Sequence, residues 1–204
     1  MTRSIADLNV SRETVERLEI YAELLRKWNS KINLVAPSTI EDLWTRHFAD
    51  SAQLLKLAPA RLGHWADLGT GGGFPGLIIA LLLHEQSGSH RMTLVESDGR
   101  KSAFLRTVLR ETGVKADVIT DRIENVPPLA AAVVSARALA PLTKLLEYAD
   151  RHLGQGGLAL LQKGQAWEKE LRDASSEWHF NYHVDKSVVQ ENSVILSVTG
   201  VRRV

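Results

Sequence analysis

The chain of 204 residues contains no cysteine. This absence excludes disulfides, iron–sulfur clusters, zinc–thiolate sites and any mechanism that uses a cysteine nucleophile. The seven histidines include no H-E-x-x-H pair, the helical spacing with which two histidines bind zinc. We therefore expect no metal site.

Long hydrophobic runs are also missing. The longest apolar stretch spans Leu77 to Leu83, far short of the roughly 20 residues that cross a bilayer as a helix. The residues after Met1 form no hydrophobic signal region. We expect a soluble, cytoplasmic protein without a membrane partner.

An excess of charge of one sign is missing as well. The net charge is +1, which neither demands nor excludes a polyanionic partner. The length suffices for one α/β domain with a good core and a small accessory segment, whereas two full domains would need a longer chain.

Glycine, in contrast, is concentrated in one place. Five of the ten residues from Asp67 to Gly76 are glycine. A predicted buried strand over residues 62–66 precedes this run, and an apolar helical stretch follows it. Glycines permit φ > 0 and close approach of a ligand, and the N–H groups of a helix N-terminus point at that ligand. The run therefore predicts a turn that holds a nucleotide-like cofactor.

Two other interpretations of the run stay open. It can be a tight turn without a ligand, or a dinucleotide site, because its last glycines formally satisfy G-x-G-x-x-G at positions 71, 73 and 76. The register argues against the dinucleotide site. Counted from Gly69, the first glycine after the strand, Phe74 stands where the third glycine should be.

An acidic residue ends the next predicted strand, which runs from Met92 to Glu96. A carboxylate at this place can accept both hydrogen bonds of a ribose diol. Together with Asp67 before the glycine turn, this pattern resembles the S-adenosyl-L-methionine (AdoMet) loop of Rossmann-like class I methyltransferases.

The first 60 residues are predicted to be helical. Ser11 is a plausible N-cap, and an apolar stripe at helical spacing includes Val15, Leu18, Ala22 and Leu25. Two short helices are predicted over residues 40–44 and 48–57. We expect residues 1–60 to form a helical segment packed on the core, and residues 61–204 to form the cofactor-binding domain.

From residue 62 onward, predicted strands and helices alternate. The predicted strands cover residues 63–68, 91–96, 115–120, 131–135 and 157–162, and the predicted helices cover 74–85, 99–112, 139–152 and 165–177. This alternation predicts an α/β fold with a mostly parallel sheet. Two strands without a helix between them, 178–184 and 193–198, predict a terminal antiparallel hairpin, which completes a seven-stranded Rossmann-like sheet.

The residues at the end of the fourth predicted strand, together with the lack of cysteine, narrow the class of group that can accept the methyl. Enzymes that methylate exocyclic amines carry an Asn/Asp-Pro-Pro-aromatic element after the fourth strand, whereas this chain has Ser135-Ala136-Arg137-Ala138. Methylation of pyrimidine C5 needs a thiolate adduct, which a chain without cysteine cannot form. A ring nitrogen such as guanine N7 needs neither feature, because its lone pair is free and no proton has to be removed.

Four motifs in order give the chain its resemblance to a known family. They are Arg46-His47-Phe48-Ala49-Asp50-Ser51, the run from Asp67 to Gly76, Ser135-Ala136-Arg137-Ala138 and Leu161-Gln162-Lys163-Gly164. With them, nearly the whole chain resembles the RsmG (GidB) family of guanine-N7 methyltransferases. The resemblance implies AdoMet as cofactor, S-adenosyl-L-homocysteine as product and, as target, a guanine in the 530 loop of bacterial 16S rRNA (position 527).

The resemblance and the strand ends together nominate the site residues. Candidates for cofactor binding are Gly69, Gly71, Phe74, Glu96, Ile123, Glu124 and Arg137. Arg137 is also the candidate for a positioning role in catalysis, for which we expect no general base. Candidates for RNA contact are Arg46, His47, Arg100, Lys101, Arg106, Arg122 and Lys163.

The family resemblance has small departures. Gly72 stands where many relatives have proline, Phe74 where many have leucine, and Glu96 where many have aspartate. The expected partner is 16S rRNA or the small ribosomal subunit, and we expect a monomer. The alternatives are a small-molecule methyltransferase, with the helical segment as a lid, and a non-enzymatic AdoMet or nucleotide sensor.

Overall fold

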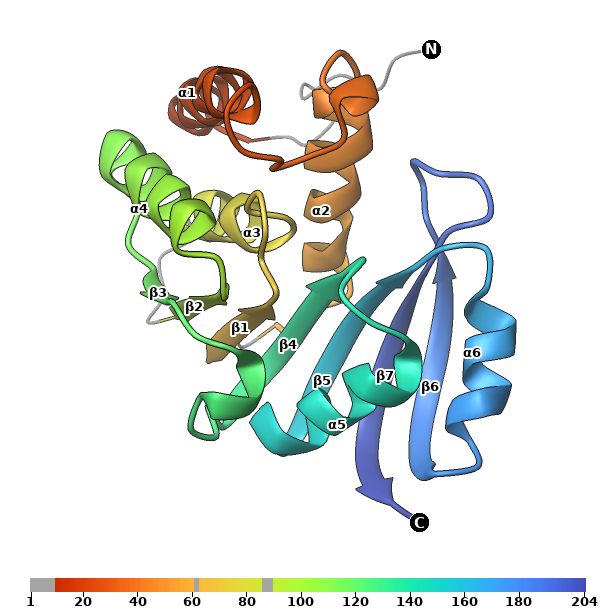
Figure 1. The fold of residues 1–204 in the computed structure, drawn as a ribbon. Helices are drawn as coiled ribbons and strands as arrows, with labels where there is room; N and C mark the ends of the chain where they lie inside the picture. Colours follow the sequence, from red (N-terminus) through yellow and green to blue (C-terminus); the bar gives the residue numbers. More distant parts are fainter. Residues whose placement is uncertain (1–9, 61–62, 86–89) are drawn as a thin grey trace.

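The computed structural model describes residues 10–60, 63–85 and 90–204. Its centre is a seven-stranded sheet in the order β3-β2-β1-β4-β5-β7-β6 (Figure 1). The strands are β1 (His64–Leu68), β2 (Arg91–Val95), β3 (Asp117–Ile119), β4 (Ala131–Arg137), β5 (Leu153–Lys163), β6 (Trp178–Lys186) and β7 (Val194–Arg203). The first five are mutually parallel, whereas β7 pairs antiparallel with β5 and β6. The predicted mostly parallel sheet with a terminal antiparallel hairpin is confirmed.

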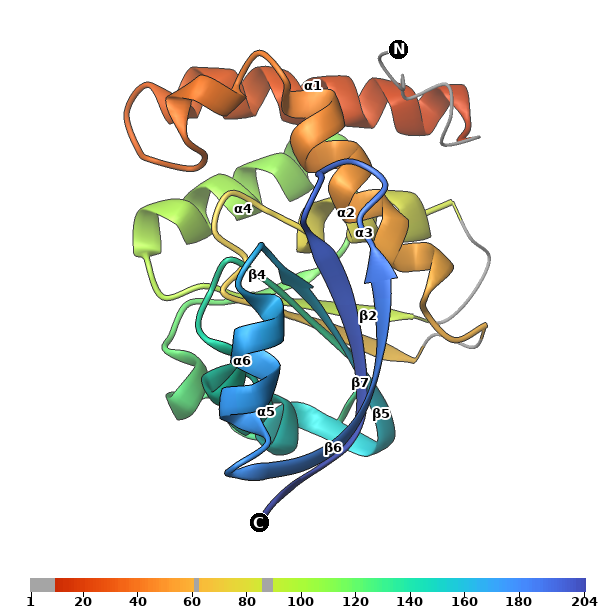
Figure 2. The same ribbon diagram turned by 90° about the vertical axis from the view of Figure 1, so that its right-hand side faces the viewer.

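Helices cover both faces of this sheet. The helices α3 (Gly76–Leu83) and α4 (Gly99–Thr112) share a core with one face, and α5 (Leu142–His152) and α6 (Trp167–Ala174) share a core with the other. Helix α1 (Arg12–Asn29) lies outside α3 and α4 as a further layer (Figure 2). None of these described helices is long and apolar enough to cross a membrane.

Consecutive residues of the strands divide between the two cores, because side chains alternate across a sheet. The pairs are Trp65 and Ala66, Leu94 and Val95, Val133 and Val134, Leu160 and Leu161, and Ile195 and Leu196, with the first of each pair facing the core of α3 and α4. These five strands are thus buried on both faces, whereas the edge strands β3 and β6 are partly exposed. Functional groups are therefore placed at the edges of the sheet and at the ends of its strands.

The N-terminal segment is held to the core by a buried helix face. Ser11 caps α1 by accepting a hydrogen bond from the N–H of Thr14, as predicted. Leu18, Tyr21 and Leu25 of α1 are completely buried and belong to the same apolar cluster as α3. The division of the chain at residue 60 stays a prediction, since the core is continuous across it.

The helix predicted over residues 40–44 is wrong. The chain instead forms a 3₁₀ turn, Pro37–Thr39. The second predicted helix, over residues 48–57, corresponds to a helical run that begins earlier, at Trp44. This run consists of a π-helical turn (Trp44–Ala49), α2 (Asp50–Ala52) and a 3₁₀ turn (Gln53–Lys56). Residues 74 and 75 likewise belong to the glycine turn, so α3 is shorter than the helix predicted over residues 74–85.

Candidate functional site

The glycine turn between β1 and α3 has the backbone conformation that its composition predicts. Gly69, Gly71 and Gly73 have φ of 66°, 59° and 103°, a region that side chains with a Cβ rarely adopt. A Cβ at Gly69 would also overlap the side chain of Leu139. Glycine is therefore required here by both the backbone and the space.

Glu96 and Tyr21 hold this turn from two sides. The backbone N–H of Gly71 donates to Oε2 of Glu96 at 2.8 Å, and the N–H of Asp98 donates to Oε1 at 2.8 Å. From α1, the hydroxyl of Tyr21 donates to the carbonyl oxygen of Gly72 at 2.6 Å. The turn is fixed in place because separate parts of the chain bond its backbone.

Asp67 is completely buried beneath the turn. Its carboxylate accepts hydrogen bonds from Ser135 Oγ at 2.6 Å and from the N–H of Gly76 at 3.0 Å. The indole Nε1 of Trp65 donates to the same Ser135 Oγ at 2.9 Å. Burial raises the pKa of Asp67 to about 6, and these hydrogen bonds oppose part of the increase. Asp67 therefore joins β1, β4 and the start of α3.

A cavity of about 450 Å³ opens in front of this turn. Its lining includes every residue nominated for cofactor binding: Gly69, Gly71, Phe74, Glu96, Ile123, Glu124 and Arg137. The carboxyl ends of β1, β2 and β4 meet here, which is where ligands bind in open parallel sheets. We refer to this space as the first cavity.

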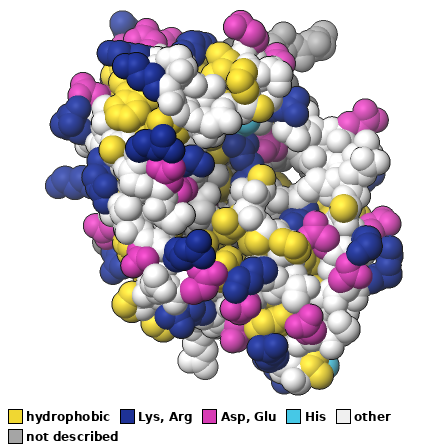
Figure 3. All heavy atoms as spheres, viewed as in Figure 1, with side chains coloured by type: hydrophobic (Ala, Val, Ile, Leu, Met, Phe, Trp, Pro, Cys, Tyr) yellow, Lys and Arg dark blue, Asp and Glu magenta, His cyan; other side chains and the backbone are white. Residues whose placement is uncertain are grey.

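A second cavity, of about 500 Å³, lies beside the first. Its lining comes from the π-helical turn, the carboxyl ends of β4 and β5, and the loop before β7; it includes Arg46, His47, Asp50, Arg137, Gln162, Lys163 and Ser187. Arg137 and Ala138 line both cavities. The molecular surface is hollowed below the N-terminal helical segment, in front of these strand ends (Figure 3).

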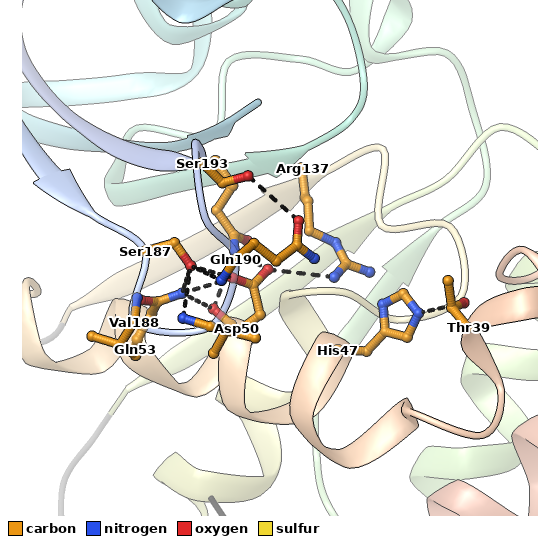
Figure 4. Close-up of polar contacts among 11 residues, drawn as sticks. Thr39, His47, Asp50, Gln53, Arg137, Ser187, Val188, Gln190 and Ser193 are labelled. Carbon is orange, nitrogen blue, oxygen red and sulfur yellow. Dashed lines mark hydrogen bonds and ion pairs between the residues drawn. The ribbon is translucent and has the colours of Figure 1, made fainter. Parts of the chain in front are cut away.

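Arg137 stands at the boundary between the two cavities. Its guanidinium lies 4.7 Å from the ring centroid of Phe74, and its Nη1 is 3.6 Å from Oδ2 of Asp50. Figure 4 shows Arg137 between Asp50 and His47. Burial lowers the pKa of Arg137, whereas the nearby Asp50 raises it, so the group keeps its charge.

Asp50 gathers several segments of the chain around its carboxylate (Figure 4). The amide Nε2 of Gln53 donates to Oδ1 and that of Gln162 to Oδ2, each at 2.7 Å. Ser187 Oγ also donates to Oδ1, at 3.2 Å. Burial raises the pKa of Asp50, whereas Arg137, Ser187 and Gln162 lower it. Asp50 belongs to one of the four sequence motifs, but no local pattern predicts this cluster.

Two of the residues nominated for RNA contact are buried in this region. His47 is 8% exposed, and its ring stacks on Phe74 with centroids 4.9 Å apart. Burial and the neighbouring Arg137 lower the pKa of His47 to about 3. Nζ of Lys163 lies 2.6 Å from Oε2 of Glu170. His47 is therefore neutral near pH 7, and Lys163 has a carboxylate partner.

The other nominated cations are distributed differently. Lys101 and Arg122 line the first cavity and Arg46 lines the second. Arg106 donates to the carbonyl oxygen of Val118 at 2.9 Å and to Thr120, although its side chain stays exposed. Arg100 pairs with Asp98. In Figure 3, Lys and Arg side chains are interspersed with acidic ones over the visible face.

One histidine spacing was overlooked in the sequence analysis. His179 and His183 are four residues apart, the spacing that brings two histidines together on a helix. They lie in β6, where an extended backbone separates such positions by about 13 Å. Within the described residues, no group of three His, Cys, Asp or Glu side chains is arranged to hold a metal ion.

Solved structures place this architecture among the methyltransferases. M. jannaschii TYW2 in complex with AdoMet aligns with a TM-score of 0.59 and 14% identity, covering 86% of this chain and 80% of that one. A SAM-dependent methyltransferase from Aquifex aeolicus aligns with the same TM-score and identity, covering 87% and 97%. The fold is that of the Rossmann-like class I methyltransferases.

Sequence comparison identifies the family within this class. The GidB family, described as rRNA small subunit methyltransferase G, matches residues 14–198. A protein of that name from Ruegeria pomeroyi is 54% identical over 97% of this chain and 96% of its own length, and one from Paracoccus denitrificans is 46% identical over 96% and 99%. The chain belongs to the GidB family. These relatives support neither the small-molecule enzyme nor the sensor.

Proposed function

We propose that this protein transfers the methyl group of AdoMet to N7 of a guanine in the 530 loop of bacterial 16S rRNA. The observation that carries this proposal is the family match over residues 14–198, together with relatives such as one 54% identical that is named ribosomal RNA small subunit methyltransferase G. Such an enzyme acts in the cytoplasm on 16S rRNA or on the small subunit. We propose that it does so as a monomer.

The first cavity has the chemistry that AdoMet requires. Each oxygen of Glu96 accepts one backbone hydrogen bond and retains a further lone pair for a ribose hydroxyl. Ile123 supplies an apolar wall for the adenine, and the adjacent Glu124 backbone would read its edge. Gly69 and Gly71 let the backbone approach the amino-acid part of the cofactor closely. Phe74 and Arg137 close the end nearest the second cavity.

Bound AdoMet would supply an electrophilic methyl group on a sulfonium. Guanine N7 presents an in-plane lone pair and carries no proton, so this chain has to align the base rather than deprotonate it. Correct orientation of two reactants can supply about 7–11 kcal/mol of the barrier reduction. This is consistent with a second cavity in which His47 is neutral and the Asp50 carboxylate is occupied by three hydrogen-bond donors and the ion pair with Arg137.

Cations around the two cavities would bind the RNA backbone. Arg46, Lys101, Arg122 and Lys163 are placed at the cavity linings, and Arg100 and Arg106 lie on α4 beside them. Phosphate contacts of this kind make affinity fall steeply with salt concentration. His47 would contribute as a neutral group, because its low pKa excludes a charged phosphate contact near pH 7.

Purified protein can test the reaction directly. The protein would be incubated with methyl-labelled AdoMet and small subunits from cells that lack its gene, and the rRNA would then be digested to nucleosides. We expect label only in 7-methylguanosine. Label in another nucleoside would contradict the assignment to N7, and the absence of label from subunits, deproteinised 16S rRNA and assembly intermediates alike would contradict the proposed substrate.

A further inference from the structure

We propose that the second cavity binds the Watson–Crick edge of the target guanine and that Arg137, Gln162 and His47 distinguish guanine from other bases. This inference rests on the proposed function and names the site of its acceptor. The cavity adjoins the first one at Arg137 and Ala138. A base held there by its Watson–Crick edge would leave N7, on the neighbouring Hoogsteen edge, free to face the methyl donor.

Gln162 offers a hydrogen-bond acceptor that the protein does not use. The side chain is 8% exposed, and its Oε1 is buried without a hydrogen-bond partner among the residues that the structure describes. The amide cannot turn to exchange its two ends, because Nε2 already donates to Oδ2 of Asp50 at 2.7 Å and to the Asp50 carbonyl at 3.1 Å. A buried acceptor without a partner costs free energy, and a donor on a bound base would remove that cost.

His47 offers a second unused acceptor, and the surrounding bonds assign its tautomer. The hydroxyl of Thr39 donates its single proton to the carbonyl of Ala36 at 2.8 Å. With the hydroxyl proton directed at Ala36, the 2.8 Å bond between Thr39 and His47 Nε2 places the ring proton on Nε2. Nδ1 then carries a lone pair, and it is buried with no hydrogen-bond partner in the described part of the chain. The low pKa of His47 keeps Nδ1 unprotonated throughout the working range.

Arg137 adds hydrogen-bond donors to the two acceptors of Gln162 and His47. Its guanidinium is held by Asp50 and Phe74 at the boundary of the cavities. One donor and two acceptors complement guanine, which presents O6 as an acceptor and the N1 and N2 hydrogens as donors. Adenine presents an amino group and an unprotonated N1 at the corresponding positions, so it would leave the same protein groups unpaired. A single bond from Arg137 to O6 also leaves N7 uncovered.

The test uses small subunits reconstituted with guanosine or inosine at the target position. Inosine keeps O6, N1–H and N7 but lacks the 2-amino group. We expect the wild-type protein to prefer guanosine by about tenfold in kcat/KM. One of the two residues accepts a hydrogen bond from the 2-amino group. In the variant that removes this acceptor, Gln162→Met or His47→Phe, the ratio of kcat/KM for guanosine to that for inosine should fall to nearly one.

Gln53→Met is the matched control, because Gln53 is an equally buried amide that holds the same Asp50 carboxylate. This variant should keep the preference for guanosine even if its rate is lower. Calorimetry with S-adenosylhomocysteine measures, for every variant, whether the first cavity is intact. A preference that persists unchanged in both Gln162→Met and His47→Phe would overturn the inference.

Ala166→Trp provides a second test that does not disturb the core. Ala166 is exposed and lines the second cavity, so a tryptophan there should block the acceptor while S-adenosylhomocysteine still binds. Ala60→Trp, at an exposed position outside both cavities, should leave methyl transfer unchanged. Full activity of Ala166→Trp would contradict the acceptor site alone, whereas a wild-type protein that forms no 7-methylguanosine would contradict the proposed function.

Discussion

The hydroxyl of Tyr21 donates a 2.6 Å hydrogen bond to the carbonyl oxygen of Gly72. Tyr21 is completely buried in α1, and Gly72 lies in the glycine turn 51 positions later. The ring of Tyr21 also stacks on Phe74, which lines the first cavity. The N-terminal helical segment therefore supports the conformation of the turn that we assign to the cofactor.

Tyr21→Phe removes this bond and leaves the Gly72 carbonyl oxygen without its donor. We expect the affinity for S-adenosylhomocysteine to fall by about threefold to tenfold, which corresponds to about 1 kcal/mol. Isothermal titration calorimetry measures it. Tyr182→Phe, at a residue that is 53% exposed, should have no effect. Equal affinity in the wild type and Tyr21→Phe would show that α1 does not support the turn.

Gly76→Ala should destabilise the fold. A Cβ at this position would lie 2.5 Å from Cδ2 of Leu94 and 2.6 Å from Oδ2 of Asp67, and both neighbours are buried. We expect a loss of about 2 kcal/mol or more in the free energy of unfolding, measured in urea. Gly99→Ala, also at a helix start but with no atom within 4 Å of the added Cβ, should change it by less than about 1 kcal/mol. Similar values for the two variants would contradict the close packing at Gly76.

Asp67 should make stability depend on pH. Its pKa of about 6 in the folded protein exceeds the value of about 3.9 expected in the unfolded chain. The folded state therefore binds the proton more tightly, and this contribution to stability is complete below about pH 4 and is lost as the pH rises through 6.

Asp67→Asn removes that titration. The difference in unfolding free energy between the wild type and Asp67→Asn should shift against the wild type by about 2 kcal/mol between about pH 4 and pH 7. Taking the difference cancels the titration of the other carboxylates. Urea unfolding across this pH range measures it, and a constant difference would show that Asp67 is ionised with an ordinary pKa.

Glu96→Ala should weaken cofactor binding. The change removes the proposed acceptor of the ribose hydroxyls and also frees the N–H groups of Gly71 and Asp98. We expect the binding free energy of S-adenosylhomocysteine to fall by about 1–3 kcal/mol. Glu168→Ala, at an exposed position of α6, serves as the control. Unchanged affinity in Glu96→Ala would remove the ribose assignment.

Features encoded locally were predictable from sequence. The positive φ values in the glycine turn follow from glycine at positions 69, 71 and 73, and the places of Asp67 and Glu96 follow from the ends of β1 and β2. The terminal hairpin was predictable because two β-rich stretches lack an intervening helix. In each case, neighbouring residues carry the whole signal.

Features that depend on distant residues were not predictable. Ser187 reaches Asp50 across 137 positions, and no local pattern marks either residue as a partner of the other. The π-helical turn at Trp44–Ala49 was not predictable either, because the apolar pattern of so short a stretch does not distinguish a π-helical turn from an α-helical one. The neutral state of His47 depends on its burial and on Arg137, which only the folded chain brings together.

The central claim is that this protein places one methyl group on a guanine N7 of 16S rRNA. The most direct measurement is a position-resolved map of 7-methylguanosine, by reduction and aniline cleavage, in 16S rRNA from a strain lacking the gene and from the same strain complemented with it. We predict that cleavage at one guanine of the 530 loop is absent in the deletion strain and restored by the gene. Identical maps in the two strains would contradict the account.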